Sequence, residues 1–173
     1  MRHLKILAVA ACVAAAGCGS DSSSPSTPSQ PNTINFTATL TPANEVPAIT
    51  NAESTGRGTA TIKFNVTRDS AGAIQSGNIL FHYDLTGFPA GTTINLSHIH
   101  TGGPTVAGPI LVNTGQTAAT ALGLPTGAGS YEVTATTDAA TMQSIIDNPA
   151  NFYFNVHSSL NPGGVARGQL VKQ

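Results

Sequence analysis

The stretch Gly58-Thr-Ala-Thr-Ile-Lys-Phe-Asn-Val66 has an apolar or small residue at every second position. Its apolar residues are Ala60, Ile62, Phe64 and Val66, and each pair is separated by Thr, Lys or Asn. Successive side chains of a β-strand point to opposite faces, so this pattern buries one face and leaves the other to solvent. The stretch therefore predicts a half-buried β-strand.

Similar segments continue on both sides of this stretch, separated by turn residues such as Gly, Pro, Asn and Asp. One segment differs, because Asp138 can cap a helix and Asn148-Pro149 would end it. We therefore expect an all-β fold, an antiparallel Greek-key β-sandwich of immunoglobulin-like or superoxide-dismutase-like type, with one short helix. The other predicted strands are 34–40, 78–85, 94–100, 109–112, 129–135, 152–157 and 168–172.

The amino terminus has the pattern of an export signal. Residues 1–17 combine a basic start with an apolar run that is too short to span a bilayer stably. The closing Ala15-Ala16-Gly17-Cys18 resembles the bacterial lipobox, in which cleavage precedes a cysteine that carries a lipid. We therefore expect Cys18 to anchor the protein to a membrane of the cell envelope. Gly19 follows the cysteine, which by the same resemblance implies the outer membrane; plain secretion is the alternative.

The residues after the signal divide into two parts. Residues 18–33 are rich in Ser and Pro and are expected to form a polar tether behind the anchor. Residues 34–173 are expected to form a single domain. Cleavage before Cys18 would leave no second cysteine, so that domain would have no internal disulfide.

Composition argues against several classes of function. Only 9% of residues are charged. Loss of Arg2 and Lys5 with the signal would leave five Lys/Arg against eight Asp/Glu, a net charge of −3. A weakly acidic chain without a basic cluster lacks the charges that neutralise phosphates, so we expect no nucleic-acid partner. The sequence contains no Gly-x-Ser-x-Gly, Gly-Lys phosphate-binding or His-Glu-x-x-His motif, so we expect no enzyme.

Three histidines are the candidates for chemistry. His98 and His100 are two residues apart, which places them on one face of a strand, and His157 ends another strand. Because Ile94 and Leu96 precede them on the same face, we expect this row to face the core. Three imidazoles can bind copper or zinc. The alternative is structural, with the histidines bonded to turn carbonyls after Gly102. His-x-His also occurs in the copper-ligand strand of copper/zinc superoxide dismutase, but the other features of that enzyme are missing.

Three motifs in order carry a resemblance to a known family. They are Asn44-Glu-Val-Pro47, His98-Ile-His-Thr-Gly102, and Phe154-Asn-Val-His157 leading to Asn161-Pro-Gly-Gly-Val-Ala-Arg-Gly-Gln-Leu170. Together they resemble the CHRD domain, named after chordin and common in bacterial secreted proteins. The likeness covers roughly residues 34–172. The position after Gly164, often acidic in the family, is Val165 here. Chordin antagonises secreted growth factors, and the bacterial members have no agreed activity.

Glu45 and Arg167 fall in the first and last of these motifs. The terminal strands of a sandwich are often neighbours, so one hypothesis pairs the two side chains across the ends of the domain. The alternative is two separate surface charges, each worth less than about 1 kcal/mol.

Two functions from different classes follow. The first is a non-enzymatic binding or structural module, tethered to the membrane through its lipid, that recognises an extracellular protein or glycan. The second is a metal-binding or redox-related protein that holds copper or zinc at the three histidines. No cofactor is certain in either case.

Overall fold

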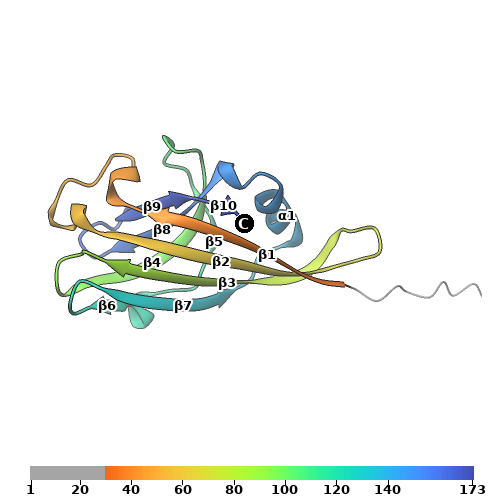
Figure 1. The fold of residues 1–173 in the computed structure, drawn as a ribbon, viewed down its shortest axis with the longest axis horizontal. Coiled ribbons are helices and arrows are strands. Elements are labelled where there is room, and N and C mark those ends of the chain that lie inside the picture. Colours follow the sequence, from red (N-terminus) through yellow and green to blue (C-terminus); the bar gives the residue numbers. More distant parts are fainter. Residues whose placement is uncertain (1–29) are drawn as a thin grey trace, which may run out of the picture.

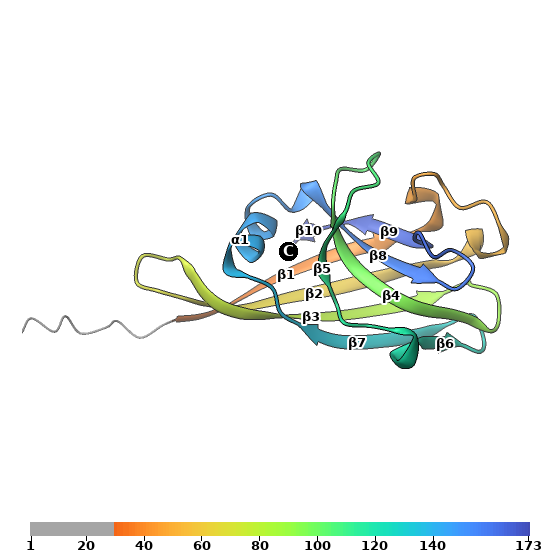
Figure 2. The same cartoon turned by 180° about the vertical axis from the view of Figure 1, so that it is seen from behind.

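The computed structural model describes residues 30–173, which form two antiparallel β-sheets packed face to face (Figures 1 and 2). The first sheet has the strand order β10-β1-β2-β3-β7. The second has the order β5-β4-β8-β9, with β6 paired to β4. The strands are β1 Gln30–Leu40, β2 Arg57–Arg68, β3 Ile74–Thr86, β4 Thr92–Thr101, β5 Ile110–Asn113, β6 Leu122–Leu124, β7 Gly129–Ala135, β8 Phe152–Ser158, β9 Ala166–Gln169 and β10 Val171–Lys172. The predicted all-β sandwich is confirmed.

Strand β2 has the alternation read from the sequence. Ala60, Ile62 and Phe64 are fully buried, and the residues between them are more exposed. Ile62 lies opposite Phe36 of β1 and Phe81 of β3, so three neighbouring strands present their apolar residues to the same face. That shared face is the wall of the core.

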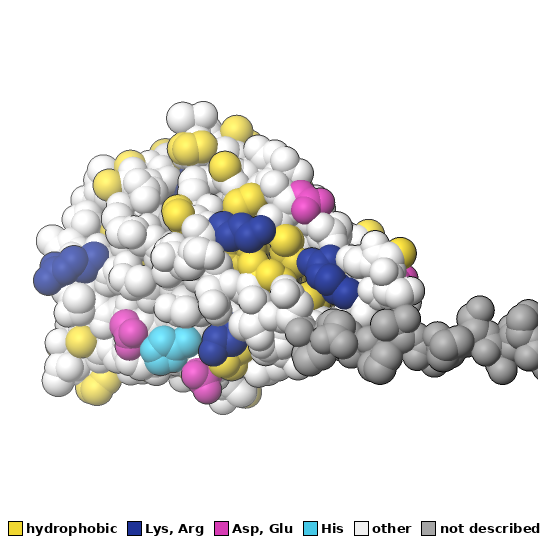
Figure 3. Space-filling view, turned by 45° about the vertical axis from the view of Figure 1, so that its right-hand side comes forward, with side chains coloured by type: hydrophobic (Ala, Val, Ile, Leu, Met, Phe, Trp, Pro, Cys, Tyr) yellow, Lys and Arg dark blue, Asp and Glu magenta, His cyan; other side chains and the backbone are white. Residues whose placement is uncertain are grey.

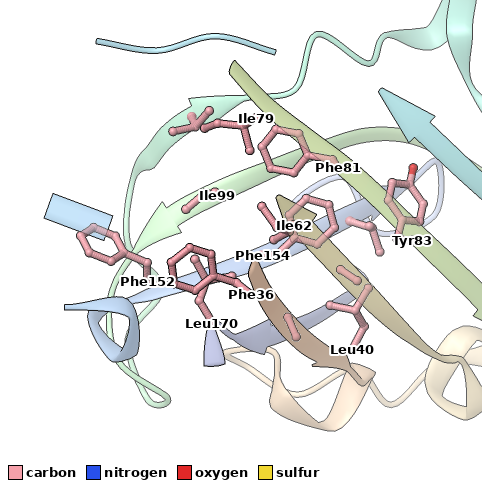
Figure 4. Close-up of a cluster of buried hydrophobic side chains, with 14 of the residues drawn as sticks. Phe36, Leu40, Ile62, Ile79, Phe81, Tyr83, Ile99, Phe152, Phe154 and Leu170 are labelled. Carbon is pink, nitrogen blue, oxygen red and sulfur yellow. The ribbon is translucent and has the colours of Figure 1, made fainter. Parts of the chain in front are cut away.

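The core fills the space between the sheets (Figure 4). Phe81 of the first sheet stacks on Phe154 of the second, with ring centroids 5.7 Å apart. Tyr83 also meets Phe154, at 5.7 Å, and its hydroxyl donates to Gln116. Burying one such aromatic side chain is worth roughly 1.5–3 kcal/mol, so these contacts bind the layers together.

The predicted helix is also confirmed. Helix α1 spans Ala139–Asp147, and the Asp138 side chain accepts a hydrogen bond from the Thr141 backbone. Met142, Ile145 and Ile146 are its buried residues. The helix closes one end of the sandwich beside β3 (Figure 1). No helix in residues 30–173 is long and apolar enough to cross a membrane.

Three expectations about the strands need correction. The predicted strand 168–172 is two strands: β9 belongs to the second sheet and β10 to the first, with buried Leu170 between them. Strand β6 was not predicted. Strand β1 begins at Gln30 and pairs with β2 from there, so the last residues of the predicted tether belong to the sheet. The signal peptide, Cys18 and the rest of the tether lie outside the described residues.

The fourth correction concerns β4. Its pairing with β8 shifts between Ile94 and Leu96, where one residue of β4 is added. Such a bulge exchanges the two faces of a strand. Ile94 and Ile99 both belong to the core, whereas His98 and His100 do not continue the row of Ile94. The expected core-facing histidine row is therefore wrong, and the two histidines lie on the outer face of the second sheet.

The surface shown in Figure 3 is mainly uncharged. Lysine, arginine and acidic side chains are scattered over it and do not gather into one patch. This agrees with the low charged fraction of the sequence, 9%.

Candidate metal centre

The outer face of the second sheet brings the three candidate histidines together. His98 lies opposite Asn155, His100 opposite Tyr153, and Leu96 opposite His157. Directly paired residues of neighbouring strands share a face, so these side chains form one surface. The loop residues that follow β4 and β8 cover it, and His98, His100 and His157 are only 2%, 7% and 4% exposed.

The three imidazoles converge. His98 Nδ1 lies 3.1 Å from His157 Nε2. The ring centroids are 4.8 Å apart for His98 and His157, 5.5 Å for His98 and His100, and 5.8 Å for His100 and His157. One nitrogen from each ring lies within 4.8 Å of the others. Nitrogens bound to one zinc ion in tetrahedral geometry lie about 3.4 Å apart, so relative shifts of up to about 1.4 Å would close the site.

Backbone carbonyls fix two of the rings. His157 Nδ1 is 3.0 Å from the carbonyl of Pro162, and His100 Nδ1 is 3.0 Å from that of Gly108. A carbonyl only accepts, so both Nδ1 atoms carry the proton and both Nε2 atoms of these neutral rings are acceptors. His157 Nε2 accepts from His98 Nδ1, whereas His100 Nε2 has no hydrogen-bond partner. Metal-binding histidines are commonly oriented by such a bond from the second ring nitrogen.

Burial keeps these rings neutral. It lowers the pKa of His98 to about 4, helped by the neighbouring His157 and His100. Burial also lowers the pKa of His100 and of His157 below the ordinary value, although the carbonyls of Gly108 and Pro162 act in the opposite direction. Neutral imidazole is the form that binds a metal, so protons compete little at neutral pH.

A further feature is the unpartnered polar atoms around the cluster. Within residues 30–173, three buried side-chain atoms lack a hydrogen-bond partner: Glu45 Oε1, His100 Nε2 and Asn155 Oδ1. Asn155 faces His98 across the strands. Asn155 and Glu45 both lie against Gly164. A Cβ atom added at position 164 would be 2.5 Å from Asn155 Nδ2 and 3.0 Å from both carboxyl oxygens of Glu45. Buried polar groups are normally satisfied, so His100 Nε2 and Asn155 Oδ1 mark a place beside His98 where an ion or a polar ligand could bind.

Arg167 and Glu45 are both buried, and they do not form the expected ion pair. The Arg167 guanidinium donates to three backbone carbonyls, those of Asn44, Val106 and Pro104, at 2.6, 2.8 and 2.6 Å. Burial raises the pKa of Glu45 to about 7, and nearby Arg167 lowers it only in part. The direct pairing is therefore wrong, and so is the alternative of two surface charges, because Glu45 is 8% exposed and Arg167 is 1% exposed.

Several residues that support the site were not predicted from the sequence. Tyr153 stacks on His100 with centroids 5.0 Å apart and lies 4.3 Å below the Arg167 guanidinium. Glu53 is buried and accepts from Ser158 Oγ and Asn161 Nδ2, which fixes the turn that offers the Pro162 carbonyl. Tyr153 and Asn155 precede His157 at two-residue intervals, and that spacing was the available signal.

A fourth histidine of the domain is separate from the cluster. His82 lies on the exposed face of β3, 3.2 Å from Asp84 Oδ2 and 3.6 Å from Glu132 Oε2. Its side chain is 41% exposed. It therefore offers a control for experiments on the buried cluster.

Comparison with protein families agrees with the three motifs. A family model described as the CHRD domain matches residues 36–170, which is most of the chain and includes Glu45, the three histidines and Arg167. The chain belongs to the CHRD family. Membership in this family supports a non-enzymatic module of the extracellular type. No curated protein matches the chain, and no solved structure does.

Proposed function

We propose that this CHRD protein is a metal-binding module that holds one copper or zinc ion at His98, His100 and His157. The observation that carries the proposal is the buried lone pair of His100 Nε2, which has no partner and belongs to a cluster of three nitrogens within 4.8 Å. In a purely structural site each buried ring nitrogen would normally have a hydrogen-bond partner. A buried acceptor without a donor costs free energy, which a bound cation would recover.

The donor set supports copper or zinc over harder cations. All three donors are imidazoles, and no carboxylate or thiol of the described residues belongs to the group. Magnesium and calcium prefer oxygen ligands, whereas imidazole suits zinc and copper. Binding by His98 Nδ1 requires its proton to move to Nε2, since Nδ1 now faces the lone pair of His157 Nε2.

The second candidate keeps the histidines structural and assigns the domain to recognition of an extracellular protein or glycan. It is favoured by the bonds from His100 to Gly108 and from His157 to Pro162, which would hold the covering loops even without an ion. The two candidates differ in one measurable property, namely metal affinity.

The deciding experiment is a competition titration of purified, untagged protein with a chromophoric chelator for zinc and for copper. We expect one ion per chain with a dissociation constant below about 1 μM, and the same result for a His82→Ala control. A His98→Ala/His100→Ala variant should lose this binding. If the variant and the wild type bind equally, or if neither binds, the metal proposal is rejected.

We further propose that the module is held at the cell envelope, in the outer membrane, by a lipid on Cys18. The lipobox-like residues 15–18 and the short apolar run before them support this. Growing cells fed a radioactive fatty acid should label the wild-type protein and not a Cys18→Ser variant. Equal labelling of both, or labelling of neither, would leave plain secretion.

A further inference from the structure

A second site lies beside the histidine cluster. A pocket of about 240 Å³ opens between the loop that follows β1 and the turn that joins β8 to β9, which are neighbours in Figure 2. Its apolar walls come from Val46, Pro47 and Ile49 on the loop and from Leu160 and Pro162 on the turn, and Glu45 is its one charged residue. The pocket therefore combines an apolar channel with a single carboxyl group.

The carboxyl group of Glu45 lacks the donors that a buried acid needs. The side chain is 8% exposed, and Oε1 is sealed from solvent without a hydrogen-bond partner. Both oxygens lie against Gly164, which lines the same pocket. Arg167 does not supply the donor, because it donates to the carbonyls of Asn44, Val106 and Pro104. A cationic ligand that reaches the other oxygen, Oε2, would offset part of the free energy lost by burying this carboxyl group.

We propose that this pocket binds the ammonium group of a lysine side chain presented by a partner protein. The four methylene groups of lysine suit the apolar walls, and its compact charge needs only one carboxyl oxygen. A guanidinium prefers two oxygens in a bidentate contact, and Oε1 is sealed here. The volume of about 240 Å³ accommodates a side chain and is below the range usual for larger small-molecule ligands.

The rim of the pocket favours a protein as the source of the ammonium. Val46 and Leu160 both line the pocket, and they remain 39% and 57% exposed. A free amine would leave most of that apolar surface in water, whereas a protein surface around a lysine would cover it. The inference does not depend on the metal, because no histidine lines this pocket.

The test uses butylammonium chloride as the probe and amide NMR spectra of the purified protein as the readout. We expect shifts confined to Val46, Ile49 and the turn 160–164. Glu45→Gln should weaken binding at least 10-fold, and n-butanol should bind at least 10-fold more weakly than butylammonium. The matched control Glu132→Gln removes an exposed carboxylate on β7 and should bind like the wild type. Absence of shifts, or equal binding by Glu45→Gln or by butanol, overturns the site.

A second comparison tests the protein source. A capped pentapeptide with a central lysine should bind at least 3-fold more tightly than butylammonium, and the same peptide with norleucine should not bind. Equal affinity of peptide and butylammonium would overturn the protein partner. Melting temperatures check the fold of Glu45→Gln, which should match or exceed that of the wild type because a buried carboxyl group is removed.

Discussion

Replacing His100 by alanine should lower the affinity for zinc or copper more than about 100-fold, because one of three ligands is lost and even residues that only orient a ligand change affinity about 10- to 100-fold. The effect should appear as lost metal-induced stability. At a metal concentration of 100 times the wild-type dissociation constant, the wild type should gain about 2.7 kcal/mol of unfolding free energy. A variant with 100-fold weaker affinity should gain only about 0.4 kcal/mol.

This comparison separates coordination from packing. The apo variant loses the stacking of His100 on Tyr153 and its bond to Gly108, but it also loses the unpartnered Nε2. Each protein is compared with its own metal-free form in denaturant titrations. The change in stability caused by the substitution itself therefore cancels from the metal-induced gain. His82→Ala is the control and should keep the full gain, since His82 lies on exposed β3. A full gain in His100→Ala would place the ion elsewhere.

The fold could be predicted largely from local alternation. The half-buried strand predicted at residues 58–66 is confirmed. Both neighbours of β2 pair with it over this whole stretch, so every second residue faces the core. The helix was predictable because Asp138 caps it and Asn148 ends it, and both signals are local. Patterns fail where the chain changes sheet. Around Leu170 the alternation continues, but β9 and β10 belong to different sheets, and only long-range pairing decides this.

The sequence was enough to propose the three histidines of the candidate site, but not to predict on which face of the sheet they lie. The spacing of His98 and His100 correctly places both on one face. Extending the two-residue alternation from His98 back to Ile94 assigns the histidines to the core face, which is wrong. The extra residue of the β4 bulge reverses the faces, and the alternation in the sequence does not reveal it. The burial of the histidines depends on loop carbonyls at Gly108 and Pro162, which are backbone atoms that no side-chain pattern reveals.

Replacing Arg167 by methionine should destabilise the domain by about 3 kcal/mol or more. The guanidinium is 1% exposed and ties the carbonyls of Asn44, Val106 and Pro104 to β9. Hydrogen bonds to a charged group contribute about 1.5–3 kcal/mol each, and removing one partner of a buried set leaves the others unsatisfied. Methionine fills similar volume, so denaturant unfolding would report mainly the lost bonds and the lost contact with the Tyr153 ring.

The same substitution decides what Arg167 is for. If its role were to pair with Glu45, the loss would largely vanish in a Glu45→Gln background, because the partner would already be neutral. If it fastens the loops that follow β1 and β4, most of the loss should persist there, and metal affinity should fall as the β4 loop, which carries Gly108, loosens. Arg57→Met is the matched control, since Arg57 is exposed at the start of β2 and should change stability by no more than about 0.5 kcal/mol. A loss at Arg167 as small as that at Arg57 would show that the three carbonyl contacts contribute no net stability.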